Sequence, residues 1–155
     1  MDKLIAIAVL ALVTAGLIIC AEYYSFDSLR YKANARFKRI RPSLVIWADS
    51  VVRLCGGLDE YGLNIKNTIS FSAAEVNRLC AAANERLAQL ARNGENVEAL
   101  TDRLSELCAE VFGEVSDYND AVLAYNKKAI TPLGKLVAQL LHLRAPEQLS
   151  DFFFQ

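Results

Sequence analysis

Apolar residues recur at helical spacing along most of the chain, in steps that alternate between three and four residues. This period is typical of amphipathic helices and not of strands, in which apolar residues occupy every second position. It predicts four helices after an uncharged N-terminal segment, and no strand. Their approximate ranges are 29–58, 69–90, 97–129 and 132–142. The inward apolar track of the first helix is expected to run through Leu54 to Leu58. One side of the last helix is expected to carry Leu133, Leu136, Val137, Leu140 and Leu141.

Short polar and glycine-containing segments separate the predicted helices. The glycine pair at 56–57 is expected to end the first helix, and the Asn-Gly pair at 93–94 the second. Glycine takes up the left-handed backbone conformation that follows many helices. Asn67 or Thr68 is expected to cap the start of the second helix, because both side chains can accept hydrogen bonds from its first backbone N–H groups.

The first long helix contains a proline, Pro42, in its interior. Proline removes one helical hydrogen bond and bends the helix. The apolar steps nevertheless stay in phase from Ile40 to Leu44. We therefore expect one bent helix. The alternative is that Pro42 begins a separate helix at its first turn, where proline is favoured.

The order of the helices predicts the fold class. Short connections between long amphipathic helices make sequential helices antiparallel neighbours. We expect an all-α protein: an N-terminal transmembrane helix followed by an elongated antiparallel up-and-down helical bundle of three long helices and one short C-terminal helix. The expected division is a membrane anchor at 1–24 and a helical bundle domain at 25–155.

The anchor is predicted from the segment 4–21, which has no charged residue over 18 positions. At 1.5 Å per residue it reaches about 27 Å, enough to cross a slightly thinned bilayer. A retained membrane anchor is the favoured interpretation. A cleaved signal peptide and a lipoprotein signal with lipidated Cys20 are alternatives, although Ile18 and Ile19 are bulky where such signals prefer small residues.

Basic residues follow the apolar segment within about 20 positions, whereas only Lys3 precedes it. Basic flanks stay on the cytoplasmic side of a membrane, so the C-terminal domain is expected in the cytoplasm. Four scattered cysteines without a C-x-x-C spacing agree with that reducing compartment. Anionic lipid headgroups are the expected contact of the basic residues. These residues are Arg30, Lys32, Arg36, Lys38, Arg39 and Arg41.

Few residues that could support catalysis are present. His142 is the single histidine, so one chain can form neither a three-histidine zinc site nor a di-iron site with two Glu-x-x-His motifs. The sequence contains no phosphate-loop, dinucleotide-binding or G-x-S-x-G motif. A net charge of −1 and the lack of a recognition motif argue against nucleic-acid binding. The sequence therefore predicts a protein that is not an enzyme and holds no cofactor.

An acidic stripe, with carboxylates four residues apart, lies on the third predicted helix. Like charges at this spacing destabilise a helix, so a balancing charge is expected nearby. The basic segment 30–41 is the candidate, in this chain or in a neighbouring copy. Carboxylates at this spacing could also bind a metal ion, so a metal-dependent enzyme that uses the stripe is an alternative hypothesis. The stripe consists of Asp102, Glu106, Glu110 and Glu114.

Two Tyr-Asn pairs stand seven residues apart on the same helix, at 118–119 and 125–126. The phenol rings share a heptad position with Val97, Leu104 and Val111, which predicts that both point into a helix–helix seam with the asparagines beside them. Buried phenols and amides need hydrogen-bond partners, and such contacts can fix the register of a seam.

The Tyr-Asn helix also resembles the C-terminal signature of the LemA family, Y-N-x-x-V-x-x-Y-N followed closely by proline. The segment 36–45 is similar to that family's R-R-x-x-L-I-P-N-L-V. Arg41, Ser43 and Thr131 depart from the pattern, so the chain is identified as a divergent member. The matching residues are Arg36, Pro42, Leu44, Val45, Tyr118, Asn119, Val122, Tyr125, Asn126 and Pro132.

The resemblance implies a membrane-anchored helical bundle of the bacterial cell envelope without established enzymatic chemistry. With the anchor and the heptad-like helices, it predicts a single-pass scaffold at the bacterial inner (cytoplasmic) membrane that self-associates and shapes or organises the membrane. The alternative is an adaptor that docks another membrane protein, for example a peptidase. The alternative is suggested by the run of Phe152, Phe153 and Phe154. Three adjacent aromatic side chains cannot all face one core, so at least one is expected to contact a partner or lipid.

Overall fold

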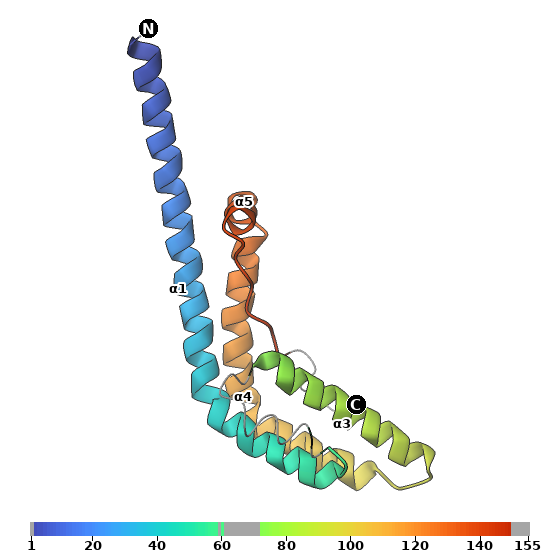
Figure 1. Cartoon of the computed structure of the whole chain (residues 1–155). Coiled ribbons are helices and arrows are strands. Elements are labelled where there is room, and N and C mark those ends of the chain that lie inside the picture. Colours follow the sequence, from blue (N-terminus) through green and yellow to red (C-terminus); the bar gives the residue numbers. More distant parts are fainter. Residues whose placement is uncertain (1, 59, 61–71, 150–155) are drawn as a thin grey trace. The chain divides into compact units, whose positions relative to one another are not determined.

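The computed structural model describes residues 2–58, 60 and 72–149. Their regular structure is helical, with no strand among the described residues, so the predicted all-α class is confirmed. The helices are α1 (Asp2–Cys55), α3 (Ala73–Arg92), α4 (Glu98–Ala129) and α5 (Pro132–Leu140), which Figure 1 labels.

Helix α1 is continuous through Pro42, as the phase of the apolar residues predicted. Ile40 and Leu44, which flank the proline, are both buried. The helix ends at Cys55, and the next two residues, Gly56 and Gly57, have φ angles of 61° and 71°. The predicted end of this helix is therefore confirmed, because these glycines adopt the left-handed conformation that L side chains avoid.

The inward face of α1 drifts at its C-terminal end. The predicted apolar track included Leu54, but that side chain is 38% exposed, and Cys55 is buried in its place. An α-helix turns once in 3.6 residues, so a strict alternation of threes and fours gradually rotates off the buried face. The prediction of an inward Leu54 was wrong for this reason.

Helix α3 begins later than its apolar track suggested. Its N-cap is Ser72, and the backbone N–H of Ser72 donates to the Glu75 carboxylate over 2.8 Å. This is the return hydrogen bond of a capping box. The predicted caps Asn67 and Thr68 lie outside the described residues. The predicted end is confirmed, since Asn93 is the C-cap and Gly94 has a φ of 81°.

The turn between α4 and α5 is fixed by Thr131. Its hydroxyl accepts a hydrogen bond from the Gly134 backbone N–H (3.1 Å) and donates one to the Lys128 carbonyl (2.8 Å). Pro132 follows as the first residue of α5, where its missing N–H costs nothing. The observed bounds of both helices lie within two residues of the predicted ranges.

The chain divides into two compact units, each assembled from separated segments. Unit 1 comprises residues 1–34 and 121–146, and unit 2 comprises residues 35–120 and 147–155. In unit 1 a small core forms around Phe26, Tyr125 and Val137. The rings of Phe26 and Tyr125 meet edge to face, with centroids 5.1 Å apart.

Unit 2 contains the larger core, to which α1, α3 and α4 all contribute. Most of its described heptad-like positions are buried, as their spacing predicted, and Leu54 is exposed. The fully buried side chains of this core include Leu44, Val51, Val76, Leu79, Cys80 and Leu104.

Candidate functional site

The first third of α1 has a long apolar surface that nothing in unit 1 covers. Every described side chain from Lys3 to Ile18 is exposed, with Leu4 and Leu12 both at 74%. Among the described residues, α1 is the one helix that is long and apolar enough to cross a membrane, by length and composition. Water-exposed apolar patches of this size are rare on soluble proteins.

Beyond this apolar surface, α1 is attached to α4 by a partly buried ion pair. The Lys128 ammonium lies 2.5 Å from the Glu22 carboxylate, and both side chains are only 22% exposed. The same ammonium stands over the Phe26 ring, 5.6 Å from its centroid. A cation held between a carboxylate and an aromatic face is well stabilised, so this contact fixes α4 beside the end of the apolar surface.

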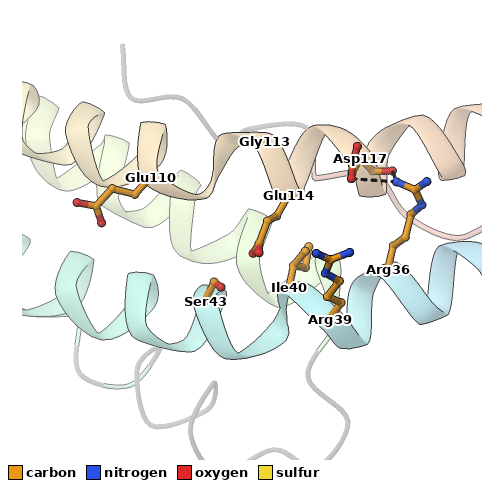
Figure 2. A pocket seen from close by; sticks show the side chains of 8 residues that line it. All are labelled: Arg36, Arg39, Ile40, Ser43, Glu110, Gly113, Glu114 and Asp117. Carbon is orange, nitrogen blue, oxygen red and sulfur yellow. Dashed lines mark hydrogen bonds and ion pairs between the residues drawn. The ribbon is translucent and has the colours of Figure 1, made fainter.

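Unit 2 contains a charged groove of about 480 Å³ between α1 and α4. Figure 2 shows Arg36, Arg39, Ile40 and Ser43 on one wall, opposite the acidic residues of α4. The Arg36 guanidinium pairs with the Asp117 carboxylate over 3.2 Å and donates to the Asp117 carbonyl over 3.1 Å. Asp117 lies three residues beyond Glu114, so the basic segment supplies a balancing charge beside the acidic stripe within the same chain.

Two of the four residues of the acidic stripe line this groove, and the other two lie outside it. Glu110 and Glu114 line it, and Figure 2 shows Glu114 reaching toward Ile40 and Arg39. One Glu114 carboxylate oxygen is buried without a hydrogen-bond partner among the described atoms. Asp102 and Glu106 are exposed outside the groove, and Glu106 pairs with Arg103 over 2.6 Å.

The groove does not form a metal centre from the residues that the structure describes. No cluster of three or more His, Cys, Asp or Glu side chains in that part of the chain could hold an ion. The groove can pair opposite charges and align two helices. Exposed pairs such as Arg36–Asp117 contribute little to the free energy of unfolding.

The first Tyr-Asn pair holds the C-terminal segment of unit 2. The Tyr118 hydroxyl donates to the Glu147 carbonyl over 2.6 Å. Asn119 makes two bonds to Leu149: its amide donates to the Leu149 carbonyl (3.0 Å), and its side-chain oxygen accepts from the Leu149 N–H (2.9 Å). Asn77 of α3 donates to the Gln148 carbonyl over 2.8 Å.

In these contacts, side chains of α3 and α4 form hydrogen bonds with the backbone of residues 147–149, as a neighbouring strand would in a sheet. Tyr118 is 4% exposed and Leu149 is 2% exposed. Burial, and then the nearby charge of Glu147, raise the pKa of Tyr118 from 10.0 to about 12. The phenol therefore stays protonated, and remains a donor, over the whole physiological range.

The second Tyr-Asn pair acts in unit 1. Tyr125 is buried, and its hydroxyl donates to the Arg144 carbonyl over 3.4 Å. Burial raises the pKa of Tyr125, while the charge of Arg30 opposes the change. Asn126 beside it is half-buried.

The predicted burial of both phenols is confirmed, but their partners differ from the expectation. The seam hypothesis placed their hydrogen bonds between helices, whereas both bond the non-helical segment that follows α5. The hydrogen bonds of Asn77 and of residues 144–149 were not predicted from the sequence. Segment 143–149 has no helical period, and only the need of buried phenols and amides for partners hinted at it.

The remaining motif and basic positions fall into two groups. Leu44 and Val122 are fully buried, and Val45 is half-buried, which suits packing positions. Arg30, Lys32 and Lys38 are exposed, Arg39 is exposed at the wall of the groove, and Arg41 is half-buried. Phe152, Phe153 and Phe154 lie outside the described residues.

The cysteines also differ in their surroundings. Cys20, at the end of the apolar segment, is exposed, whereas Cys55, Cys80 and Cys108 are buried. Burial raises the pKa of Cys55 and of Cys108, which lowers their thiolate content and their reactivity.

Comparison with known proteins adds no relative: no protein-family model, no curated protein and no solved structure matches this chain. The resemblance to the LemA family therefore rests on the motif residues alone.

Proposed function

We propose that the protein is a non-enzymatic, single-pass scaffold of the LemA type at the bacterial inner membrane. The observation that carries this proposal is the apolar surface of residues 4–18, which is exposed along its whole length. A bilayer offers that surface the apolar surroundings that the chain itself does not supply.

The basic residues after this segment support an orientation with the C-terminal part in the cytoplasm. Arg30 and Lys32 are exposed and follow the apolar surface by about three to four turns of α1, and Lys38 lies further along the helix. A charge near an anionic leaflet contributes about 1 kcal/mol to membrane binding, and this contribution falls with distance from the surface. These charges therefore favour an orientation in which the residues that follow the anchor stay on the cytoplasmic side of the membrane.

Exposed apolar side chains in unit 2 support self-association. Ile46 is 70% exposed and lies beside Trp47 at a shallow hollow whose other wall includes Leu107 and Val111. Contact between copies would cover Ile46. The proposed arrangement of α1, α3 and α4 is an elongated antiparallel bundle, whose long faces suit lateral assembly.

Two measurements on the full-length protein test the two parts of this proposal. After cell lysis the protein should remain in the membrane fraction in high salt and leave it only in detergent. In mild detergent, crosslinking should yield oligomers that an Ile46→Glu substitution diminishes, while the exposed Ser105→Glu control leaves them intact. Release by salt alone would refute the anchor, and a strict monomer at low salt would refute self-association.

An adaptor function is the second candidate, and the attachment of Leu149 favours it. Asn119 fixes the backbone at Leu149, three residues before Phe152, so the phenylalanine run follows a defined point of unit 2 in the sequence. Truncation after Leu149 should remove co-purifying membrane proteins and leave membrane insertion unchanged. If the same proteins co-purify with the truncated chain, the adaptor proposal loses its support.

A further inference from the structure

Helix α5 has an apolar face that unit 1 leaves uncovered. Gly134 and Val137 are buried against the core of the unit. Leu133, Leu136 and Leu140 are 38%, 51% and 57% exposed, although the sequence grouped them with Val137 on one packing side. At 3.6 residues per turn these three leucines lie together on one side of the helix, next to the buried face.

This face is located at the end of the apolar segment of α1. Val137 belongs to the core cluster of Phe26 and Tyr125, and Ile19 and Ala138 pack against the same cluster. Ile19 is one of the last residues of the uncharged run. Figure 1 draws α5 end-on beside α1, so within unit 1 the axis of α5 crosses that of α1.

The position of α5 is fixed by its connection to α4. A Cβ at Gly134 would collide with the Lys128 carbonyl, so the backbones approach too closely for any other residue. Lys128 in turn pairs with Glu22 on α1. The exposed leucines are therefore held at one level along α1 and cannot turn away from it without breaking these contacts.

Residues at the same level have the chemistry of a membrane–water boundary. Tyr23 and Tyr24 follow the apolar run after Glu22 and are 41% and 71% exposed, as in the aromatic belts of membrane proteins. Lys127 and Lys135 lie at the end of α4 and in α5, and Lys135 is exposed. Aromatic, basic and leucine side chains together are typical of helices that lie in the lipid headgroup region.

We propose that α5 is an interfacial helix, with Leu133, Leu136 and Leu140 inserted into the leaflet from which α1 emerges. The inference rests on the proposed membrane anchor and deepens it, because a second contact would hold unit 1 against the lipid surface. Lipid is the occupant because the exposed leucines continue the uncovered apolar surface of α1. A second copy of the chain is the competing occupant, and the experiment below separates the two.

Site-directed spin labelling of the full-length protein tests this arrangement. In a Cys20→Ala background the remaining cysteines are buried, so a single exposed cysteine can be labelled. Labels are introduced by Leu140→Cys, by Leu12→Cys in the anchor, and by Gln139→Cys, which is exposed and about 100° around α5 from Leu140. The protein is reconstituted in vesicles of phosphatidylethanolamine and phosphatidylglycerol.

The expected result is a contrast between oxygen, which concentrates in lipid, and a water-soluble nickel chelate. Labels at positions 12 and 140 should collide mainly with oxygen, and the label at 139 several-fold more often with nickel. Equal nickel accessibility at 140 and 139, with position 12 in lipid, would overturn the interfacial helix and leave the anchor intact. Nickel access at position 12 would overturn both. A label at 140 that reaches neither reagent would indicate a second copy and also overturn the lipid contact. Leu136→Cys repeats the measurement on the leucine face.

Discussion

The two units use their apolar side chains in opposite ways. In unit 2, α1, α3 and α4 bury theirs against one another, and the large apolar residues left exposed in its described part are Ile46, Leu54 and Phe112. Unit 1 has a small core around Phe26, but α1 and α5 expose most of their leucine, isoleucine and valine side chains. The exposed apolar surface of unit 1 is the one that the proposed bilayer contact would cover, whereas unit 2 covers most of its own apolar surface.

The largest effect should come from a charge placed in the exposed apolar surface of unit 1. Leu12→Arg puts a guanidinium near the middle of the proposed span, which costs about 3 kcal/mol of insertion free energy. Leu12 and Ile46 are similarly exposed, at 74% and 70%, so Ile46→Arg is the matched control in unit 2. We expect Leu12→Arg to shift the protein out of the membrane fraction and Ile46→Arg to leave its distribution unchanged. Equal behaviour of both variants would remove the distinction between the units.

The next largest effect should come from the close approach in unit 1. Gly134→Ala places a methyl group against the Lys128 carbonyl, and such overpacking costs about 1–3 kcal/mol. In unit 2, Gly113 is an interior residue of α4 where an added Cβ would meet no atom within 4 Å, so Gly113→Ala should instead stabilise by up to about 1 kcal/mol. Thermal unfolding in detergent measures both changes. A neutral Gly134→Ala would show that α5 is not held as tightly as its geometry requires.

The Tyr-Asn pairs allow the same comparison through hydrogen bonds. Tyr118→Phe in unit 2 removes a 2.6 Å bond to Glu147 and should cost about 1 kcal/mol of unfolding free energy. Tyr125→Phe in unit 1 removes a 3.4 Å bond to Arg144 and should cost less, because the bond is long. Denaturant unfolding of the two variants gives the order, and a larger loss for Tyr125→Phe would contradict it.

High pH should remove the Tyr118 contribution without a substitution. The folded-state pKa is raised from 10.0 to about 12, so the neutral phenol stabilises the fold fully below pH 10. This contribution is lost as pH rises toward 12, since an ionised phenol has no proton to donate to Glu147. Stability should therefore fall more steeply over this range in the wild type than in Tyr118→Phe. Parallel pH profiles would place the titrating group elsewhere.

The smallest effect is expected for the ion pair at the groove. Arg36 and Asp117 are 47% and 67% exposed at their side chains, so their coupling should be about 0.5 kcal/mol and should fade with salt. A double-mutant cycle with Arg36→Ala and Asp117→Ala measures the coupling free energy. A value several times larger would mean that the groove is a structural centre of unit 2.

The sequence contained enough information for the helices themselves. The apolar phase across Pro42 predicted one continuous α1, and the glycines after Cys55 and Arg92 predicted two of the helix ends, because both signals act locally. The later start of α3 could not be read from the apolar track, which continues upstream of the capping box at Ser72 and Glu75.

The partners of the Tyr-Asn pairs could not be predicted in the same way. Tyr118 and Asn119 bond residues 29 and 30 positions downstream, in a segment without any period. Such contacts depend on where α5 returns the chain, and that in turn depends on Gly134 and Thr131. The exposed side of α5 escaped prediction for a related reason: Leu133, Leu136 and Val137 look alike in a helical pattern, and only packing separates the buried from the uncovered ones.

The most direct test of the difference between the units is photo-crosslinking in cells with a photoreactive phenylalanine analogue at Leu12 or at Ile46. Both side chains are exposed to a similar extent, so each analogue reports what lies beside its unit. Mass spectrometry of the adducts should show phospholipid attached at position 12 and none at position 46. Protein adducts at position 12, or the same products at both positions, would contradict the proposal that the apolar surface of unit 1 faces lipid.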